Sequence, residues 1–185
     1  DYARIRLQQI ERRHNSYLNS KSSLYSTRYY RFSRKLVFWI FKIFFGLKIY
    51  GCENLRSGGN FIFAGNHISY ADPPVVGSTL NREIWFLAKK ELFKNRFFGR
   101  LISKYHAVSI DRDSFDRKAI RKIVGLLKSG RSVLMFPEGT RATDGQIRKP
   151  KMGLGYIAIN SGTDIIPVYI SGSDRLGKAF LRKSR

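Results

Sequence analysis

The chain has 185 residues, enough for one domain with a substantial core and too few for two independent ones. Thirty-five Lys and Arg oppose thirteen Asp and Glu, and the net charge of +22 favours nucleic acid, anionic lipid headgroups or phosphorylated and CoA-like molecules as partners. The single cysteine, Cys52, excludes an internal disulfide and a multi-thiolate metal site.

The N-terminal region changes composition sharply. The first 35 residues are polar and basic, and an apolar run over residues 36–47 follows them. As a helix this run would extend about 18 Å, too short to cross a bilayer core of about 30 Å. Trp39 and phenylalanines on nearly every face favour a helix lying in the membrane interface, and a buried core helix is the alternative. We expect residues 1–50 to be a basic leader with an interfacial membrane-anchoring helix.

From residue 61 onward, short apolar runs alternate with amphipathic segments, a pattern typical of an α/β layered domain. Helices are expected over residues 116–129 and 151–161, and Pro73 and Pro74 fit the first turn of another. We predict an α/β fold with a mixed, largely parallel central sheet flanked by helices. Its strands are expected over residues 61–64, 84–87, 107–110, 133–136 and 165–170.

A histidine and a carboxylate follow the first predicted strand in the segment Asn66-His67-Ile68-Ser69-Tyr70-Ala71-Asp72. If the loop folds back, Asp72 accepts a hydrogen bond from one ring nitrogen of His67 while the other nitrogen faces a substrate hydroxyl. The pair would then be a general base and its orienting acid. The alternative is a surface histidine beside an Asp72 that caps a helix.

A second polar segment, Phe136-Pro137-Glu138-Gly139-Thr140-Arg141, emerges from a predicted buried strand. Arg141 offers a planar fork that suits phosphate oxygens, and Gly139 permits close approach of the backbone. The alternative is a Glu138–Arg141 salt bridge that closes a turn.

Two further cations, Lys89 and Arg112, lie at or just past the ends of other predicted strands. In a parallel sheet they would converge with Arg141 beside His67 and form an anion-binding site. The alternative for each of them is a solvated surface charge.

These segments resemble, in order, the four motifs of the glycerolipid acyltransferases, and most closely the bacterial 1-acylglycerol-3-phosphate acyltransferases. The matching motifs are Asn66-His67-x4-Asp72-Pro73, Ile110-Asp111-Arg112, Phe136-Pro137-Glu138-Gly139-Thr140-Arg141 and Ile166-Pro167-Val168. The resemblance covers roughly residues 48–178. One departure is Ala142, where the family often has serine. Residues 51–185 would be the catalytic domain, with a C-terminal part of the fold missing from this sequence.

The resemblance implies that His67 removes a proton from the free hydroxyl of lysophosphatidic acid, which attacks the thioester of acyl-CoA or acyl-carrier protein and becomes phosphatidic acid. Asp72 would orient His67. No metal and no cofactor is implied, since the acyl donor is a co-substrate. The implied substrate-binding residues are Asn66, Lys89, Arg112, Glu138, Gly139, Thr140, Arg141 and Pro167.

Other functions fit parts of the sequence. Another lysolipid, such as lyso-ornithine lipid, would use the same dyad. A basic nucleic-acid-binding protein would suit the charge, but its usual motifs are missing from the sequence, so no nucleic acid partner is expected. A catalytically silent membrane protein is a third reading. We expect an enzyme that is monotopic or peripheral on anionic lipid at the cytoplasmic face of the cell membrane.

Overall fold

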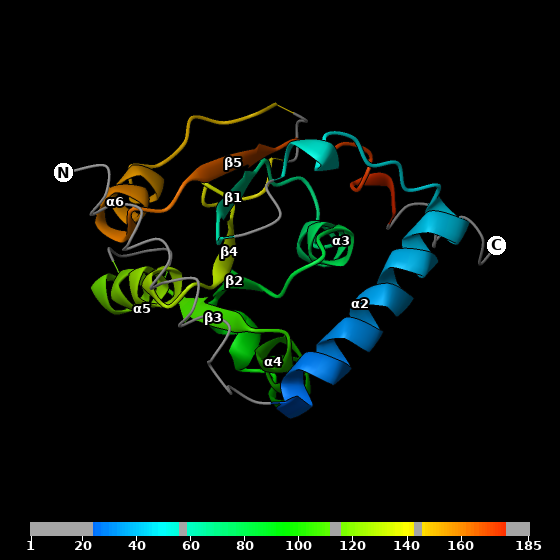
Figure 1. Ribbon diagram of the computed structural model, residues 1–185, viewed down its shortest axis with the longest axis horizontal. Coiled ribbons are helices and arrows are strands. Elements are labelled where there is room, and N and C mark those ends of the chain that lie inside the picture. The colour runs from blue at the N-terminus through cyan, green and yellow to red at the C-terminus, as the bar shows by residue number, and fades with distance from the viewer. Residues whose placement is uncertain (1–23, 56–58, 112–115, 143–145, 177–185) are drawn as a thin grey trace.

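The computed structural model describes residues 24–55, 59–111, 116–142 and 146–176, built around a central sheet (Figure 1). Five strands lie in the order β3-β2-β4-β1-β5, and every strand pair is parallel. This confirms the predicted α/β fold with a largely parallel sheet, and each predicted strand overlaps an observed one. The strands are β1 (Ile62–Gly65), β2 (Ile84–Lys89), β3 (Ala107–Ile110), β4 (Ser132–Met135) and β5 (Ile165–Val168).

Helices flank the sheet on both faces (Figure 1). The helices predicted over 116–129 and 151–161 are confirmed within two residues, and the helix that carries two prolines in its first turn begins at Asp72. The sequence did not predict α4, whose first turn is capped by the side chain of Asn95. The described helices are α2 (Leu24–Phe45), α3 (Asp72–Thr79), α4 (Arg96–Lys104), α5 (Arg117–Lys128) and α6 (Gly153–Ser161), with short 3-10 turns η1 (Cys52–Asn54) and η2 (Lys90–Phe93).

The core has two layers because successive side chains of a strand point to opposite faces of the sheet. Ile62 and its neighbour Val133 pack with residues of α5 such as Ile123. Phe63 packs on the other face with residues of α3, including Val76. The sheet is therefore covered on both sides, and its carboxyl edge remains available for loops.

Helix α2 covers Leu24–Phe45, so within the described residues the helix extends well before the apolar run that starts at residue 36. Its first half is held by the domain: Tyr30 is buried and accepts a hydrogen bond from the Ile84 N–H at 3.2 Å, and Arg34 donates to the Leu80 carbonyl at 2.8 Å. Its second half is exposed, for example at Phe44, which is 71% exposed. None of the described helices combines the length and the apolar character needed to cross a membrane.

Candidate active site

The candidate site lies along the carboxyl edge of the sheet, where the loops that follow neighbouring parallel strands meet. His67 comes two residues after β1, Lys89 ends β2, and Glu138 comes three residues after β4. The parallel arrangement is therefore what brings together residues that are up to about seventy positions apart in the chain.

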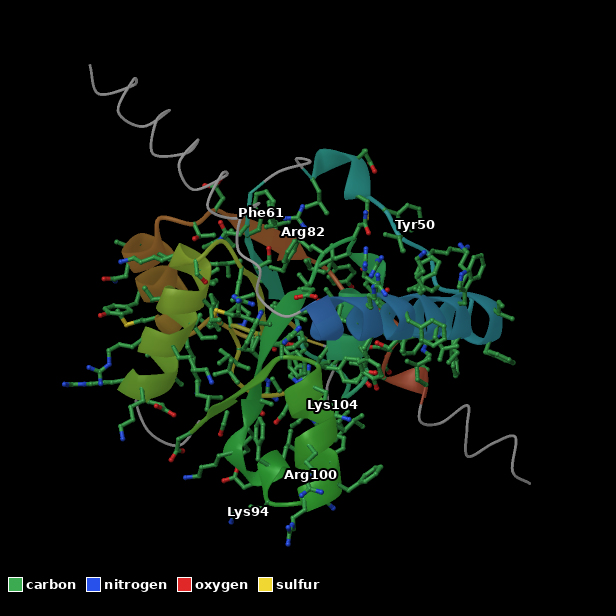
Figure 2. The ribbon with its side chains drawn as sticks, turned by 60° about the horizontal axis from the view of Figure 1, so that its bottom comes forward. Tyr50, Phe61, Arg82, Lys94, Arg100 and Lys104 are labelled. Atoms are coloured by element: carbon green, nitrogen blue, oxygen red, sulfur yellow. The ribbon has the colours of Figure 1, made fainter. Side chains whose placement is uncertain are left out.

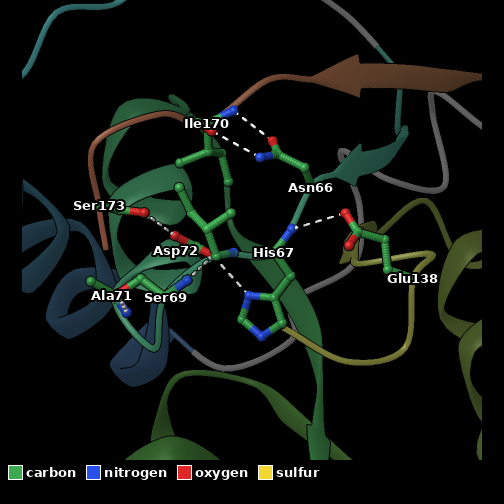
Figure 3. Close-up of polar contacts among 9 residues, drawn as sticks. Asn66, His67, Ser69, Ala71, Asp72, Glu138, Ile170 and Ser173 are labelled. Atoms are coloured by element: carbon green, nitrogen blue, oxygen red, sulfur yellow. Dashed lines mark hydrogen bonds and ion pairs between the residues drawn. The ribbon is translucent and has the colours of Figure 1, made fainter. Parts of the chain in front are cut away.

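His67 and Asp72 form a buried pair (Figure 3). The His67 Nδ1 atom lies 2.8 Å from the Asp72 Oδ2 atom, and that oxygen also accepts hydrogen bonds from the backbone N–H groups of Ile68 and Ser69 at 2.7 and 2.8 Å. Asp72 is completely buried at the start of α3. The loop thus folds back as expected, and one carboxylate orients both the histidine and its own loop.

The protonation of this pair follows from the surroundings of Asp72. Burial acts to raise the pKa of Asp72, but the hydrogen bonds that it accepts, led by the one from His67, outweigh burial and lower that pKa. An ionised carboxylate only accepts hydrogen bonds, so the His67 Nδ1–H is the donor. In the neutral ring the Nε2 atom carries the lone pair, and Figure 3 shows this atom on the side of the ring away from Asp72. The ring is stacked on Phe136 with a centroid distance of 4.1 Å.

The segment after β5 is bonded to the loop on both sides of His67 (Figure 3). The side-chain amide of Asn66 donates to the Ile170 carbonyl at 2.8 Å and accepts from the Ile170 N–H at 2.7 Å. The hydroxyl of Ser173 donates to the Asp72 Oδ1 atom at 2.5 Å. Sequence reasoning missed Ile170 and Ser173, because no local pattern marks a contact across 101 positions. A substrate-binding role for Asn66 stays a prediction.

The loop after β4 supports His67 from the other side. Glu138 is buried; its Oε1 atom accepts from the His67 N–H at 3.3 Å, and the Ala142 N–H donates to the His67 carbonyl at 2.7 Å. The Glu138 Oε2 atom has no hydrogen-bond partner within the part of the chain that the structure describes. This loop therefore fixes the backbone of His67 and leaves one buried acceptor oxygen unused.

Gly139 has a structural reason to be glycine. Its φ is +73°, a conformation that side chains rarely adopt, and an added Cβ would lie 2.9 Å from a side-chain carbon of Lys151. Lys151 also donates its backbone N–H to the Pro137 carbonyl at 2.9 Å. Lys151 is therefore a further cation at this loop, and no local motif in the sequence marks it as one.

A cavity of about 1050 Å³ opens beside the pair and collects four of the predicted site residues in its wall: His67, Lys89, Thr140 and Arg141. The guanidinium carbon of Arg141 lies 3.6 Å from the ring centroid of Tyr70, and the Lys89 Nζ atom lies 3.7 Å from Glu91. The remaining wall is largely apolar and comes from α2, α3, β2 and α4, through residues that include Val37, Gly77, Phe86, Ala88, Leu101 and Ile102.

Among the described residues, the predicted residue Pro167 lies apart from both the His67–Asp72 pair and the cavity wall. Pro167 lies in the edge strand β5, opposite Ala64, and it is exposed and outside the described cavity wall. Arg112 falls outside the described residues. Among the residues that are described, no three His, Cys, Asp or Glu side chains gather in a way that could hold a metal ion.

Comparisons with known proteins agree with this arrangement. The model of the Acyltransferase family matches residues 46–171. A 1-acyl-sn-glycerol-3-phosphate acyltransferase of Bacillus subtilis is 31% identical over 157 residues, covering 84% of this chain and 77% of the relative. One from Streptococcus pneumoniae is 36% identical over 115 residues, covering 61% and 42%.

A solved structure is similar as well. The crystal structure of the 1-acyl-sn-glycerophosphate (LPA) acyltransferase of Thermotoga maritima matches with a TM-score of 0.65 and 27% identity, covering 87% of this chain and 67% of that one. The family match runs from before the loop that bears His67 to just past Ile170, and it ends two residues before Ser173. The chain belongs to the acyltransferase family, alongside 1-acyl-sn-glycerol-3-phosphate acyltransferases.

Proposed function

We propose that this protein transfers a fatty acyl group from a thioester donor to the free hydroxyl of lysophosphatidic acid and so forms phosphatidic acid. The relatives named above carry this activity in their names. The observation that carries the proposal is the His67–Asp72 pair, whose histidine lies in the wall of a cavity that also holds Lys89 and Arg141. A base beside two cations suits an acceptor that has both a hydroxyl and a phosphate.

The proposed reaction begins at the His67 Nε2 atom. That nitrogen takes the proton of the acceptor hydroxyl while the hydroxyl oxygen attacks the thioester carbonyl. The new ester bond forms, the carbon–sulfur bond breaks, and the proton held by His67 passes to the departing thiolate. Asp72 stabilises the imidazolium by accepting a hydrogen bond from Nδ1–H, with a distance of 2.8 Å between Nδ1 and Oδ2.

Arg141 and Lys89 would hold the acceptor phosphate, and Arg112 would join them. The side chain of Lys89 is 42% exposed, and Arg141 lies over the exposed ring of Tyr70, so both cations can turn toward a ligand. The unused Glu138 oxygen, with Gly139 and Thr140 beside it, would position the glycerol portion. A guanidinium gives two parallel hydrogen bonds to a phosphate, which fixes the orientation of the acceptor.

The apolar part of the cavity would hold a fatty acyl chain. Its volume of about 1050 Å³ lies slightly above the usual range for ligand pockets, and its wall is mainly hydrocarbon. The wall includes Val37 of α2, so the region before residue 51 would contribute to substrate binding as well as to anchoring.

The proposed catalytic domain comprises residues 51–185. The donor would be acyl-CoA or acyl-carrier protein, with no metal or cofactor.

The exposed end of α2 would lie in the membrane interface. Ile43 and Phe44 are 68% and 71% exposed there. Basic side chains such as Lys94, Arg100 and Lys104 also project from and beside α4 (Figure 2). Each Lys or Arg near an anionic leaflet contributes about 1 kcal/mol to binding. We propose peripheral or monotopic attachment to anionic lipid, at the cytoplasmic face where the thioester donors would be available.

Attachment can be tested by the substitutions Ile43→Asp and Phe44→Asp. We expect both to reduce cosedimentation with vesicles of phosphatidylglycerol and phosphatidylcholine, because a buried charge is costly in the interface. The matched control is Ile159→Asp on α6, across the sheet from α2 (Figure 1), where the wild-type side chain is 84% exposed. Equal vesicle binding by all three variants would contradict the proposed anchor.

The activity can be tested with the purified protein and a panel of acceptors. We expect phosphatidic acid to form from lysophosphatidic acid with acyl-CoA or acyl-carrier protein as donor. Product from lyso-ornithine lipid alone would show that the acceptor is another lysolipid and would overturn this assignment. No acyl transfer to either acceptor from either donor would overturn the enzyme itself.

A further inference from the structure

The two oxygens of the Asp72 carboxylate accept hydrogen bonds from different donors (Figure 3). Oδ2 receives three hydrogen bonds, one from His67 Nδ1 and two from backbone N–H groups of its own loop. Oδ1 receives one hydrogen bond among the described residues, from the hydroxyl of Ser173 at 2.5 Å. Ser173 thus holds the oxygen that does not touch the histidine.

Burial makes this contact hard to replace. Asp72 is 0% exposed and Ser173 is 5% exposed, so bulk water does not reach the carboxylate. A buried charged oxygen that loses its donor keeps the cost of leaving water without compensation. The carboxylate would then turn about its last side-chain bond to share the donors on Oδ2, and the direction of its bond to His67 would change.

The conformation of the chain after β5 places the Ser173 hydroxyl against Asp72. The reciprocal bonds between the Asn66 amide and Ile170 tie this segment to the residue before His67. Gly172 then turns the chain with a φ of +79°, a conformation that favours glycine. Ser173 follows at once and reaches the far side of Asp72. The segment after β5 is therefore hydrogen-bonded to both ends of the loop between Asn66 and Asp72.

We infer that Ser173 is a positioning residue of this site, whose hydroxyl fixes the Asp72 carboxylate so that Oδ2 faces the imidazole of His67. The inference rests on the proposed function, because it assigns Ser173 a part in the same reaction. Ser173 touches no reacting atom in this scheme and acts only through Asp72. It should therefore affect the rate of the chemical step and leave acceptor binding unchanged.

The first test compares Ser173→Ala with Ser173→Thr in the full chain. We expect Ser173→Ala to lower kcat roughly 10–100-fold, the loss typical of a hydrogen bond to a charged group, with KM for lysophosphatidic acid unchanged. Ser173→Thr keeps a hydroxyl and should recover most of the rate. The control is Ser161→Ala, which removes another buried serine whose hydroxyl bonds the Ala158 carbonyl within α6.

The second test is the pH dependence of kcat. A carboxylate that has turned away from the imidazole of His67 stabilises the protonated ring less. The acid limb of the profile should therefore move to lower pH in Ser173→Ala, and it should stay in place in the Ser161→Ala control. A serine that only supported packing would lower activity without moving this limb.

A third measurement does not depend on activity. In protein labelled with nitrogen-15 histidine, the proton between His67 Nδ1 and Asp72 gives a low-field resonance, which we expect to shift or broaden in Ser173→Ala and to return in Ser173→Thr. Wild-type kcat, pH profile and resonance in Ser173→Ala would overturn the inference, and so would equal losses in both variants. If the wild type forms no phosphatidic acid, the proposed function fails, and the resonance still tests Ser173.

Discussion

The two sides of the site are built in different ways. On the side of the base, His67 and Asp72 are buried, and every oxygen of the carboxylate is held by a donor. On the side of the cations, Lys89 is partly exposed, and Arg141 lies over the exposed ring of Tyr70. A general base must be oriented before the substrate arrives, whereas a cation can remain solvated until a phosphate replaces its water. We therefore expect the first side to control kcat and the second to control acceptor affinity.

Asp72→Asn is the strongest way to break this comparison. The amide cannot stabilise an imidazolium as a carboxylate does, and its own N–H groups would meet the backbone donors of Ile68 and Ser69. We expect kcat to fall on the order of 10²–10⁴-fold with little change in KM, measured as phosphatidic acid formation.

The matched control for Asp72→Asn is Asp116→Asn. Asp116 also accepts backbone hydrogen bonds, from Ala119 and Asp111, but it caps α5 and is not part of the cavity wall beside His67. The Asp116→Asn variant should lose about 1 kcal/mol of folding stability, because it weakens the cap of α5, and its kcat should stay that of the wild type. An equal loss of kcat in the two variants would mean that carboxylate burial at the pair has no special role.

Arg141→Ala sharpens the comparison from the other side. Removal of a charge-assisted contact worth about 1.5–3 kcal/mol should raise KM for lysophosphatidic acid roughly 10–100-fold, and kcat should change much less. Steady-state kinetics over a range of acceptor concentrations separates the two parameters. The control is Arg121→Ala, which removes an exposed arginine of α5 on the other face of the sheet. A fall in kcat with unchanged KM would contradict this prediction, because it would mean that Arg141 acts in the chemical step and not in acceptor binding.

Gly77→Leu tests the apolar wall with a smaller expected effect. The nearest atom to a Cβ added at Gly77 is the Tyr30 hydroxyl at 3.7 Å, so a longer side chain would extend into the cavity. We expect long-chain donors to react a few-fold more slowly while short-chain donors keep their rate. Gly125→Leu on α5, where the added Cβ meets nothing within 4 Å, is the control. A uniform loss for all donors would contradict an acyl-binding cavity.

The smallest expected effect concerns stability and pH. Burial opposes ionisation of Asp72, yet its hydrogen bonds lower its pKa in the folded state, so the unfolded state binds the proton at higher pH. The resulting stabilisation is present above the unfolded pKa and is lost as pH falls through the folded pKa. Urea unfolding from pH 7 to about pH 3 should therefore show a shrinking stability difference between wild type and Asp72→Asn. A constant difference would exclude this contribution.

Local patterns allowed much of the fold to be predicted. The apolar stripe of α5 and the two prolines at the start of α3 are signals within a few residues of chain, and the structure confirms both elements. The close approach of His67 and Asp72 was also accessible, because five positions across a loop leave few alternatives.

Contacts between distant segments were not accessible in the same way. Ser173 reaches Asp72 across 101 positions, and Phe136 stacks on His67 from the loop that follows β4. The helical turns of α2 before the apolar run place Tyr30 and Arg34 against the start of β2 and the end of α3, which composition alone does not show. The part of the site that could be predicted is therefore its chemistry, and the part that could not is the support that holds it.

The most direct test of the account is the rate of phosphatidic acid formation by purified wild-type protein and by His67→Ala at saturating donor and acceptor. The account predicts a loss of roughly 10²–10⁴-fold with the fold retained, as judged by circular dichroism. Activity of His67→Ala equal to that of the wild type would contradict the central claim that His67 is the base.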